Sequence, residues 1–363
     1  MYSFNPTEEQ TMLIDSVKRF AENELRPVAH DADENRKLPM EIVEKGWQLG
    51  IVQASIPEQF GGFGERSAMT GVLAAEELAW GDLSGALAIL APGLYALPIL
   101  LGGTDEQKES LISVAISTNW KPCVSAIIEP QFDFSPLKMQ TTAVRNENGY
   151  TLQGRKVMVP FAENAESLLV FASLDETLQA FVVSPENEGL EIGEREDLLG
   201  IQALPTFGLS LKDVSVPLEA RIGGENGFDA QQVISSSNVA IAALGVGLSR
   251  GAYEFSRDYA KEREAFGGPI AQKQSIAFML AEMATEIEAI RLMVWEAAWM
   301  LDNDKDASRA AYLALSGVSD MTMMVTDRAV QILGGHGYIR DFPVERWMRN
   351  GRGIPNFLGM AIV

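Results

Sequence analysis

Tyr259-Ala-Lys-Glu-Arg-Glu-Ala-Phe-Gly-Gly-Pro-Ile270 is the stretch that decides the fold of this chain, because it interrupts a region of strong helical periodicity. From about residue 227 onward, apolar residues recur at the spacing of an amphipathic helix. After the interruption, one apolar stripe comprises Ile276, Leu280, Met283, Ile287, Ile290 and Val294. A polar run at residues 302–308 ends this helix, and a second long helix is predicted from Ser308 to Leu333. The last third of the chain is therefore predicted to be a helical bundle.

The middle of the chain changes character at about Trp120. Segments rich in strand-forming residues follow one another at residues 150–159, 167–172, 178–183 and 208–216. The sequence Asn146-Glu-Asn-Gly149 just before them is typical of a tight hairpin turn. Several short strands separated by turns predict a small β-barrel or β-sandwich.

The first third is predicted to be helical. Thr7 is a candidate N-cap for a helix with a helical apolar repeat, and another helix is predicted from Ser67 to Ala79. The apolar segment 84–101 is nearly long enough for a membrane span, but Pro92, Gly93 and Pro98 interrupt it. Two short buried helices joined by a turn are therefore the preferred interpretation.

Two glycine-rich segments resemble nucleotide-binding loops only superficially. Residues 56–64 form a predicted turn without the Lys-Ser/Thr pair of a phosphate cradle. Residues 245–251 lie inside a helical run and lack the glycine spacing of a dinucleotide fingerprint. Close packing of helices explains these glycines better.

Composition restricts the function classes. The formal net charge is -21 and the sequence pI is about 4.5, so general binding to nucleic acid is not expected. One cysteine, Cys123, excludes a disulfide framework within the chain, and two histidines make a zinc site improbable. The first ten residues lack the basic and apolar regions of a signal peptide, so a cytoplasmic protein is expected.

Motifs spread along the whole chain carry a family resemblance. In order they are Pro57 with Gly61-Gly62, Glu76-Glu77-Leu78-Ala79, Glu129-Pro130, Val214-Ser-Val-Pro217, Arg263-Glu-Ala-Phe266-Gly267, Leu280-Ala-Glu-Met283, Gln331-Ile-Leu-Gly-Gly-His-Gly-Tyr338 and Pro343-Val-Glu-Arg346. Each motif alone is weak, but the ordered set resembles the acyl-CoA dehydrogenase family.

The resemblance implies an α+β multidomain fold. We expect an N-terminal α-helical domain at residues 1–120, a middle β-barrel domain at residues 121–226, and a C-terminal four-helix bundle at residues 227–363. The resemblance also implies packing into a dimer or tetramer, up to a heterotetramer if the partner is a different chain. Members of this family remove the α-proton of an acyl-CoA with a glutamate and pass the β-hydride to FAD.

The resemblance implies a set of residues that hold the FAD of a neighbouring subunit. Arg263 can fork two hydrogen bonds onto the dianionic diphosphate, and Phe266 offers an aromatic face. Gln274 and Gln331 offer amide hydrogen bonds to the rest of the dinucleotide. Gly334 and Gly335 let the backbone approach it closely.

The residues that would hold the chain's own FAD depart from the family pattern. The family reads Thr-Glu-Pro and then a small-residue run where this chain reads Ile128-Glu-Pro-Gln-Phe132-Asp-Phe134. Ile128 has no side-chain hydrogen bond to offer a flavin, and the two phenylalanines are expected to crowd the space. Trp-Ile-Thr-Asn is replaced by Met158-Val-Pro160-Phe, and Pro160 has neither an N–H nor a hydroxyl.

The catalytic glutamate of the family is also replaced. An ungapped match puts Leu358 at its position, and leucine cannot accept a proton. Some members carry the glutamate before the first bundle helix, where this chain has Ser237 and Asn238. The residues that hold the pantetheine of the substrate also fall near Ser235 to Asn238.

Three hypotheses follow. The first is a subunit of a heteromeric acyl-CoA dehydrogenase that completes the FAD site of a homologous chain, with an electron-transferring flavoprotein as a possible electron acceptor. The second is a homo-oligomeric flavoenzyme of altered, lyase- or oxygenase-like chemistry. The third is a scaffold without flavin contact. The partner subunit, the acyl group and the electron acceptor stay open.

Overall fold

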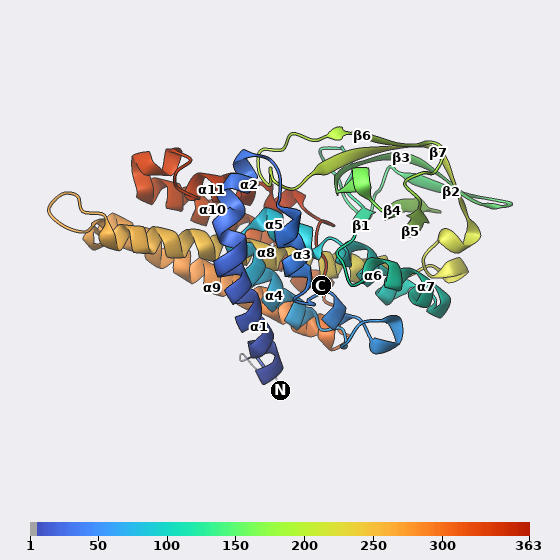
Figure 1. The fold of residues 1–363 in the computed structure, drawn as a ribbon, viewed down its shortest axis with the longest axis horizontal. Coiled ribbons are helices and arrows are strands. Elements are labelled where there is room, and N and C mark those ends of the chain that lie inside the picture. Colours follow the sequence, from blue (N-terminus) through green and yellow to red (C-terminus); the bar gives the residue numbers. More distant parts are fainter. Residues whose placement is uncertain (1–5) are drawn as a thin grey trace.

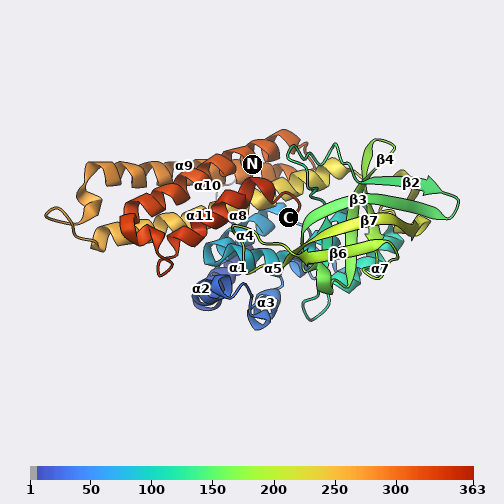
Figure 2. The same cartoon turned by 90° about the horizontal axis from the view of Figure 1, so that it is seen from above.

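The computed structural model describes residues 6–363, which form helices, then a β-sheet, then a second group of helices (Figure 1). The first five residues of the segment tested for a signal peptide lie outside the described residues. In two perpendicular views the long C-terminal helices and the sheet occupy opposite ends of an elongated molecule (Figures 1 and 2). The N-terminal helices lie along its middle.

Within residues 6–363, seven α-helices precede the sheet. They are α1 (Glu8–Phe20), α2 (Arg26–Glu34), α3 (Met40–Trp47), α4 (Ala68–Gly81), α5 (Leu83–Leu90), α6 (Gly93–Gly102) and α7 (Asp105–Ala115). The predicted cap of α1 is confirmed, because Thr7 and Gln10 exchange side chain–backbone hydrogen bonds in a capping box. The helix predicted from Ser67 begins as expected, with Ser67 capping the N–H of Thr70.

The apolar segment 84–101 forms two helices, as predicted. α5 and α6 are bent by 47° at the break that contains Pro92, and both are almost entirely buried. The helix α8 (Ala230–Glu262) is also long and apolar enough to cross a membrane by length and composition alone. Its apolar window is 94% buried against other helices, which is the position of a core helix of a globular fold.

The middle of the chain forms one seven-stranded sheet. Its strands are β1 (Cys123–Ala126), β2 (Thr142–Asn146), β3 (Gly149–Pro160), β4 (Ser167–Leu174), β5 (Thr177–Val183), β6 (Leu190–Arg195) and β7 (Thr206–Pro217). The main path is β1-β4-β2-β3-β7-β6, and β5 pairs with β4. The hairpin predicted at 146–149 joins β2 to β3.

The predicted closed β-barrel is not confirmed, because the sheet is open. In the described chain, β6 pairs only with β7 and so forms one edge. Most side chains of β6 are exposed, and its sequence Leu190-Glu-Ile-Gly-Glu-Arg195 carries three charges. A charged, exposed strand has no apolar face to cover and resists pairing with a further strand. Figure 2 shows the resulting curved, open layer over the helices α6 and α7.

The C-terminal bundle comprises α8, α9 (Gln274–Asp302), α10 (Ser308–Leu333) and α11 (Val344–Gly353). The predicted boundaries of α10 agree with the structure at both ends. Of the predicted apolar stripe on α9, four residues are buried and the first two are half-buried: Met283, Ile287, Ile290 and Val294, then Ile276 and Leu280. The stripe therefore packs against the other bundle helices, which is why the helical period was readable in the sequence.

The glycines at 245–251 serve helix packing, as predicted. A Cβ on Gly245 would lie 2.6 Å from a methyl of Val318, and one on Gly247 would lie 2.1 Å from the carbonyl oxygen of Glu76. The backbones of α8 and α4 approach each other too closely at Gly247 for any side chain.

We expect Gly247→Ala to destabilise the protein by about 1–3 kcal/mol, because two helix backbones must separate to admit the methyl group. Urea titration followed by circular dichroism measures the change. Gly251→Ala on the same helix is the matched control, because its nearest contact, the carbonyl oxygen of Trp80, is at 3.3 Å. An equal loss in both variants would contradict the packing argument.

Candidate functional site

The residues predicted to contact a neighbour's flavin lie together at one end of the bundle. Arg263 is the C-cap residue of α8, and Phe266 lies in the loop that leads to Gln274, the first residue of α9. Gln331 is in the last turn of α10, and Gly334 and Gly335 begin the short 3₁₀ helix that follows (Gly334–Tyr338). This end of the molecule is the one farthest from the sheet (Figures 1 and 2).

A small cavity of about 280 Å³ joins part of this set. Its walls are Tyr259, Arg263, Ile270, Ile332, Leu333, Gly335 and His336. Two of the six predicted contacts, Arg263 and Gly335, thus share one cavity. The other four, Phe266, Gln274, Gln331 and Gly334, lie at the same end of the bundle without lining it. All six are exposed.

The loop between α8 and α9 presents apolar surface to solvent. Phe266 is 93% exposed and has a left-handed backbone with φ of 54°, and the adjacent Gly267 has φ of 87°. Tyr338, after α10, is 85% exposed. Large aromatic side chains exposed together are typical of surfaces that another molecule covers.

The free groups at this end fit the diphosphate of a dinucleotide. Within residues 6–363 the guanidinium of Arg263 forms no ion pair or hydrogen bond, so its donors are available. A Cβ added to Gly334 or Gly335 would meet nothing within 4 Å, and the same holds for Gly267. An unpaired arginine beside open backbone is the arrangement that an anionic ligand needs.

A larger cavity of about 830 Å³ lies between the sheet and the bundle. Its walls include Ile128, Glu129, Phe132, Phe134, Val157, Met158, Ile234, Asn238, Tyr312, Leu315 and Leu358. Leu358, which the sequence match puts at the position of the family's catalytic glutamate, lies on the wall of this cavity. Ser237 is buried and its hydroxyl accepts the N–H of Gly359 at 2.7 Å, so it is used to hold the C-terminal segment.

Glu129 is the one carboxylate among the residues that line this larger cavity, and it is already paired. It accepts the ammonium of Lys156 at 2.9 Å, the N–H groups of Gln140 and Thr141 at 2.7 and 2.8 Å, and the amide of Gln131 at 3.0 Å. Burial raises the pKa of Glu129, but Lys156 and these hydrogen bonds outweigh burial and lower the pKa to about 2. Such a carboxylate is a very weak base.

Lys156, the partner of Glu129, is buried as well. The two side chains are 0% and 1% exposed, and the ammonium also donates to the carbonyl of Ile127 at 3.2 Å. Burial lowers the pKa of Lys156 to about 8 against the pull of Glu129. The pair joins the segment that follows β1 to strand β3. Residues of both segments line the larger cavity. Its role is structural, since every charge in it is paired.

The positions expected to face the chain's own flavin offer few hydrogen bonds. The N–H of Met158 donates to the carboxylate of Glu196 at 3.0 and 3.2 Å, and Pro160 has no N–H to donate. The expectation that Phe132 crowds this space is wrong, because its side chain is fully exposed at the mouth of the cavity.

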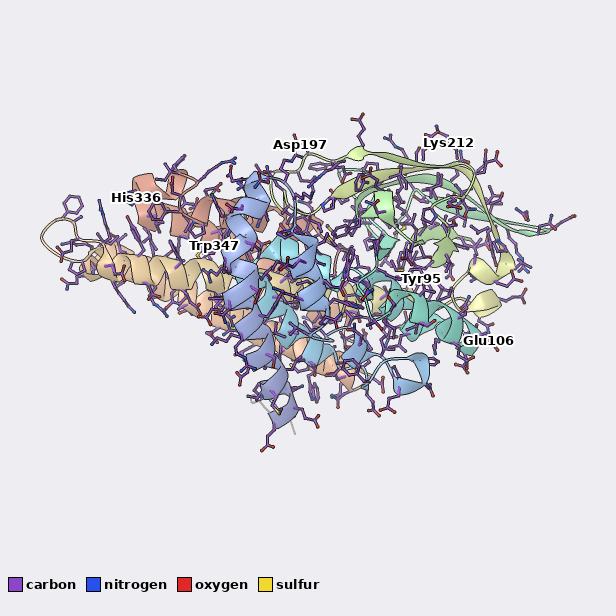
Figure 3. The ribbon with its side chains drawn as sticks, in the orientation of Figure 1. Tyr95, Glu106, Asp197, Lys212, His336 and Trp347 are labelled. Atoms are coloured by element: carbon purple, nitrogen blue, oxygen red, sulfur yellow. The ribbon has the colours of Figure 1, made fainter. Side chains whose placement is uncertain are left out.

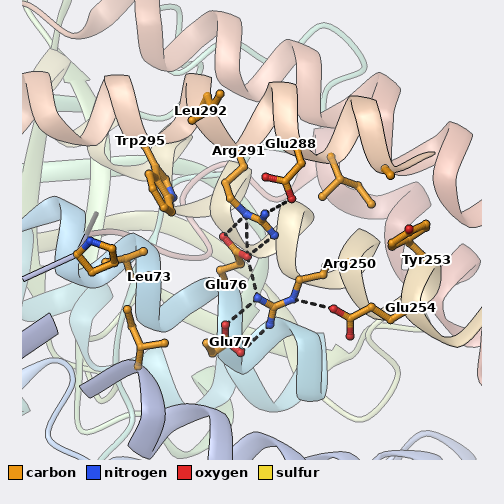
Figure 4. Close-up of a pocket in the computed structure, with 14 residues that line it drawn as sticks. Leu73, Glu76, Glu77, Arg250, Tyr253, Glu254, Glu288, Arg291, Leu292 and Trp295 are labelled. Carbon is orange, nitrogen blue, oxygen red and sulfur yellow. Dashed lines mark hydrogen bonds and ion pairs between the residues drawn. The ribbon is translucent and has the colours of Figure 1, made fainter. Parts of the chain in front are cut away.

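A third cavity of about 570 Å³ lies between α1, α4, α8 and α9 and is lined by charges (Figure 4). Arg250 bridges Glu76 at 3.0 Å and Glu77 at 2.6 Å. Arg291 bonds Glu76 at 2.8 Å and also pairs with Glu288. Glu76 and Glu77 therefore tie α4 to α8 and α9. Two acidic residues in an otherwise apolar helix could have suggested buried ion pairs, but the sequence does not show which arginines pair with them.

Comparisons with known proteins agree with this architecture. Three family models match consecutive parts of the chain: acyl-CoA dehydrogenase N-terminal domain at residues 7–118, middle domain at 125–214 and C-terminal domain at 226–360. The mitochondrial short-chain specific acyl-CoA dehydrogenase of Bos taurus is 34% identical over 353 residues, covering 95% of this chain and 85% of the relative.

Two further relatives cover almost the whole chain. The caffeyl-CoA reductase-Etf complex subunit CarC of Acetobacterium woodii is 34% identical over 368 residues, covering 98% of this chain and 96% of the relative. The structure of butyryl-CoA dehydrogenase from Megasphaera elsdenii superposes with a TM-score of 0.89 at 31% identity, covering 99% and 96% of the two chains. On these matches, and with the fold described above, the chain belongs to the acyl-CoA dehydrogenase family.

Proposed function

We propose that this chain is a subunit of an FAD-dependent acyl-CoA dehydrogenase complex, in which it completes the flavin site of a homologous partner and performs no proton abstraction itself. One observation carries the proposal: Leu358, which the sequence match puts at the position of the base, lies on the wall of the larger cavity, while Arg263, at the exposed end of the bundle, has no side-chain partner among residues 6–363. Under this proposal the chain has lost the proton-abstracting base and has kept the groups that hold a neighbour's FAD.

Proton removal is the step that this chain's own cavity does not support. Desaturation of an acyl-CoA needs a base that accepts the α-proton. Leucine cannot do so, the hydroxyl of Ser237 is engaged with Gly359, and the pKa of Glu129 is about 2. None of these groups is a base of useful strength near neutral pH.

The retained residues act as binding groups. FAD, when bound, supplies the hydride acceptor of the reaction. Arg263 would hold its diphosphate, Gln274 and Gln331 would bond its polar edges, and the open backbone at Gly334 and Gly335 would lie against it. These groups stand on the surface of the bundle, so the flavin that they hold would be bound mainly by another chain.

The proposed partners are a homologous acyl-CoA dehydrogenase subunit that bears the glutamate and an electron-transferring flavoprotein. The name of the Acetobacterium relative, a subunit of a complex with such a flavoprotein, supports the second partner. The homologous subunit is supported by the exposed aromatic residues Phe266 and Tyr338 at the bundle end.

The test is the visible absorption spectrum and the flavin content of the purified protein, first alone and then coexpressed with homologous dehydrogenase chains. We expect a colourless protein alone and about one FAD per pair of chains in the complex. A yellow protein alone, with about one FAD per chain, would overturn the proposal.

That contrary result would favour a homo-oligomeric flavoenzyme of altered chemistry. One observation speaks for this second candidate: the cavity beside Leu358 remains open, at about 830 Å³. An isoalloxazine ring and a small substrate would fit such a volume. The flavin content of the chain expressed alone separates the two candidates.

A further inference from the structure

His336 is fixed in the same cavity as Arg263, although nothing above gives it a role. The hydroxyl of Tyr259 and Nδ1 of His336 are 2.8 Å apart. The imidazole stacks on Phe342 with ring centroids 4.8 Å apart and an interplanar angle of 10°. Tyr259 stands edge-on to both rings. Held by a hydrogen bond and a stacking contact, the half-buried ring has one defined orientation.

The other ring nitrogen of His336, Nε2, has no partner in the described part of the chain. Within residues 6–363, Nδ1 is the one atom of this imidazole with a hydrogen-bond partner. When the tyrosine hydroxyl donates to Nδ1, the neutral imidazole carries its proton on Nε2, and the imidazolium carries one there too. The Nε2–H is then a donor in both protonation states.

The surroundings of His336 are those of an anion site. Arg263 and the open backbone of Gly335 line the same cavity, and the guanidinium has no partner in the described part of the chain. Figure 3 places His336 at the end of the molecule opposite to Lys212 on the sheet, and none of the residues that line the larger cavity also lines the cavity of His336. A dianionic diphosphate held by Arg263 would therefore also meet the imidazole.

We propose that His336, oriented by Tyr259, is a second donor to the diphosphate of the flavin that Arg263 holds. The inference rests on the proposed function, since it concerns the same FAD. It adds a residue outside the set predicted from the sequence and assigns Tyr259 the role of a positioning residue. The pair would make the clamp stronger and more specific for a diphosphate than Arg263 alone.

The test is the rate at which FAD leaves the purified complex, followed by the rise of free-flavin fluorescence after dilution. We expect His336→Ala to release FAD about ten times faster, as for loss of one hydrogen bond to a charged group. His336→Gln, which keeps a side-chain N–H, should restore most of the retention, and Tyr259→Phe should give an intermediate rate. His30→Ala, on the exposed face of α2, is the matched control and should release FAD at the unaltered rate.

The outcomes distinguish a failure of the role of His336 from a failure of the proposed function. If His336→Ala and Tyr259→Phe both release FAD at the unaltered rate while Arg263→Ala releases it fast, the role of His336 is overturned and the clamp stands. If Arg263→Ala also leaves the rate unaltered, the proposed function itself fails. Circular dichroism of each variant guards against misfolding, and His336→Gln keeps the inference testable if His336→Ala does not fold.

Discussion

Replacing Arg263 by alanine is expected to strip the complex of most of its FAD. The side chain is exposed and has no partner among residues 6–363, so its loss should leave the fold intact. At an interface it would be desolvated against the diphosphate, where truncating one partner of such a charge pair costs about 2–5 kcal/mol. At about 1.4 kcal/mol per factor of ten, FAD affinity should fall by at least about 30-fold. Flavin absorbance per complex after gel filtration measures the loss.

Two variants test whether the paired N–H donors of the Arg263 guanidinium, rather than its positive charge alone, retain the FAD. Arg263→Lys keeps the positive charge but loses the paired donors, so retention should be intermediate. Arg257→Ala removes a cation from the same helix that already pairs with Asp258 at 2.9 Å, and it should retain FAD normally. Equal FAD loss from Arg257→Ala and Arg263→Ala would point to general electrostatics and against a clamp.

Breaking the buried pair between Glu129 and Lys156 is expected to produce the largest loss of stability. Glu129→Gln leaves the ammonium of Lys156 buried without a counter-charge, and breaking a buried pair in this way costs about 3–5 kcal/mol. The double replacement Glu129→Gln with Lys156→Met removes both charges and should regain a large part of this loss. Urea titration of each variant measures the free energy of unfolding. A double variant no more stable than the single one would show that Gln140 and Thr141, rather than Lys156, need the carboxylate.

The same pair predicts a dependence of stability on acid. The folded-state pKa of Glu129 is about 2, below its ordinary value of 4.5. A lowered carboxyl pKa contributes stability that is fully present above pH 4.5 and is lost as the pH falls towards 2. We therefore expect the free energy of unfolding to fall more steeply between these values in the natural protein than in Glu129→Gln. Parallel slopes would mean that other carboxylates account for the acid loss.

The sequence predicted many residues of the candidate site, but it did not predict which of them contact one another. Arg263 and the glycines at 334–335 were predicted together, and the structure places both segments at one end of the bundle. The motif at residues 331–338 does not by itself indicate a function for His336, because its partner Tyr259 is 77 residues away in the chain. The pairing of Glu76 and Glu77 with Arg250 and Arg291 was missed for the same reason. Each of these contacts joins segments far apart in the sequence, and no local sequence pattern shows that such segments meet in the fold.

The sequence by itself determined the order of helical and strand-rich regions and several helix ends, and it predicted a leucine at the position of the family's base. Capping boxes, prolines and helical periods act over a few residues, so Thr7, Pro92 and the boundaries of α10 could be placed without the fold. The tertiary structure alone decided that the sheet stays open at β6, that Glu129 is neutralised by Lys156, and that the cavity beside Leu358 remains open. Strand pairing, charge burial and cavity volume depend on contacts between distant segments, and only the folded chain brings those segments together.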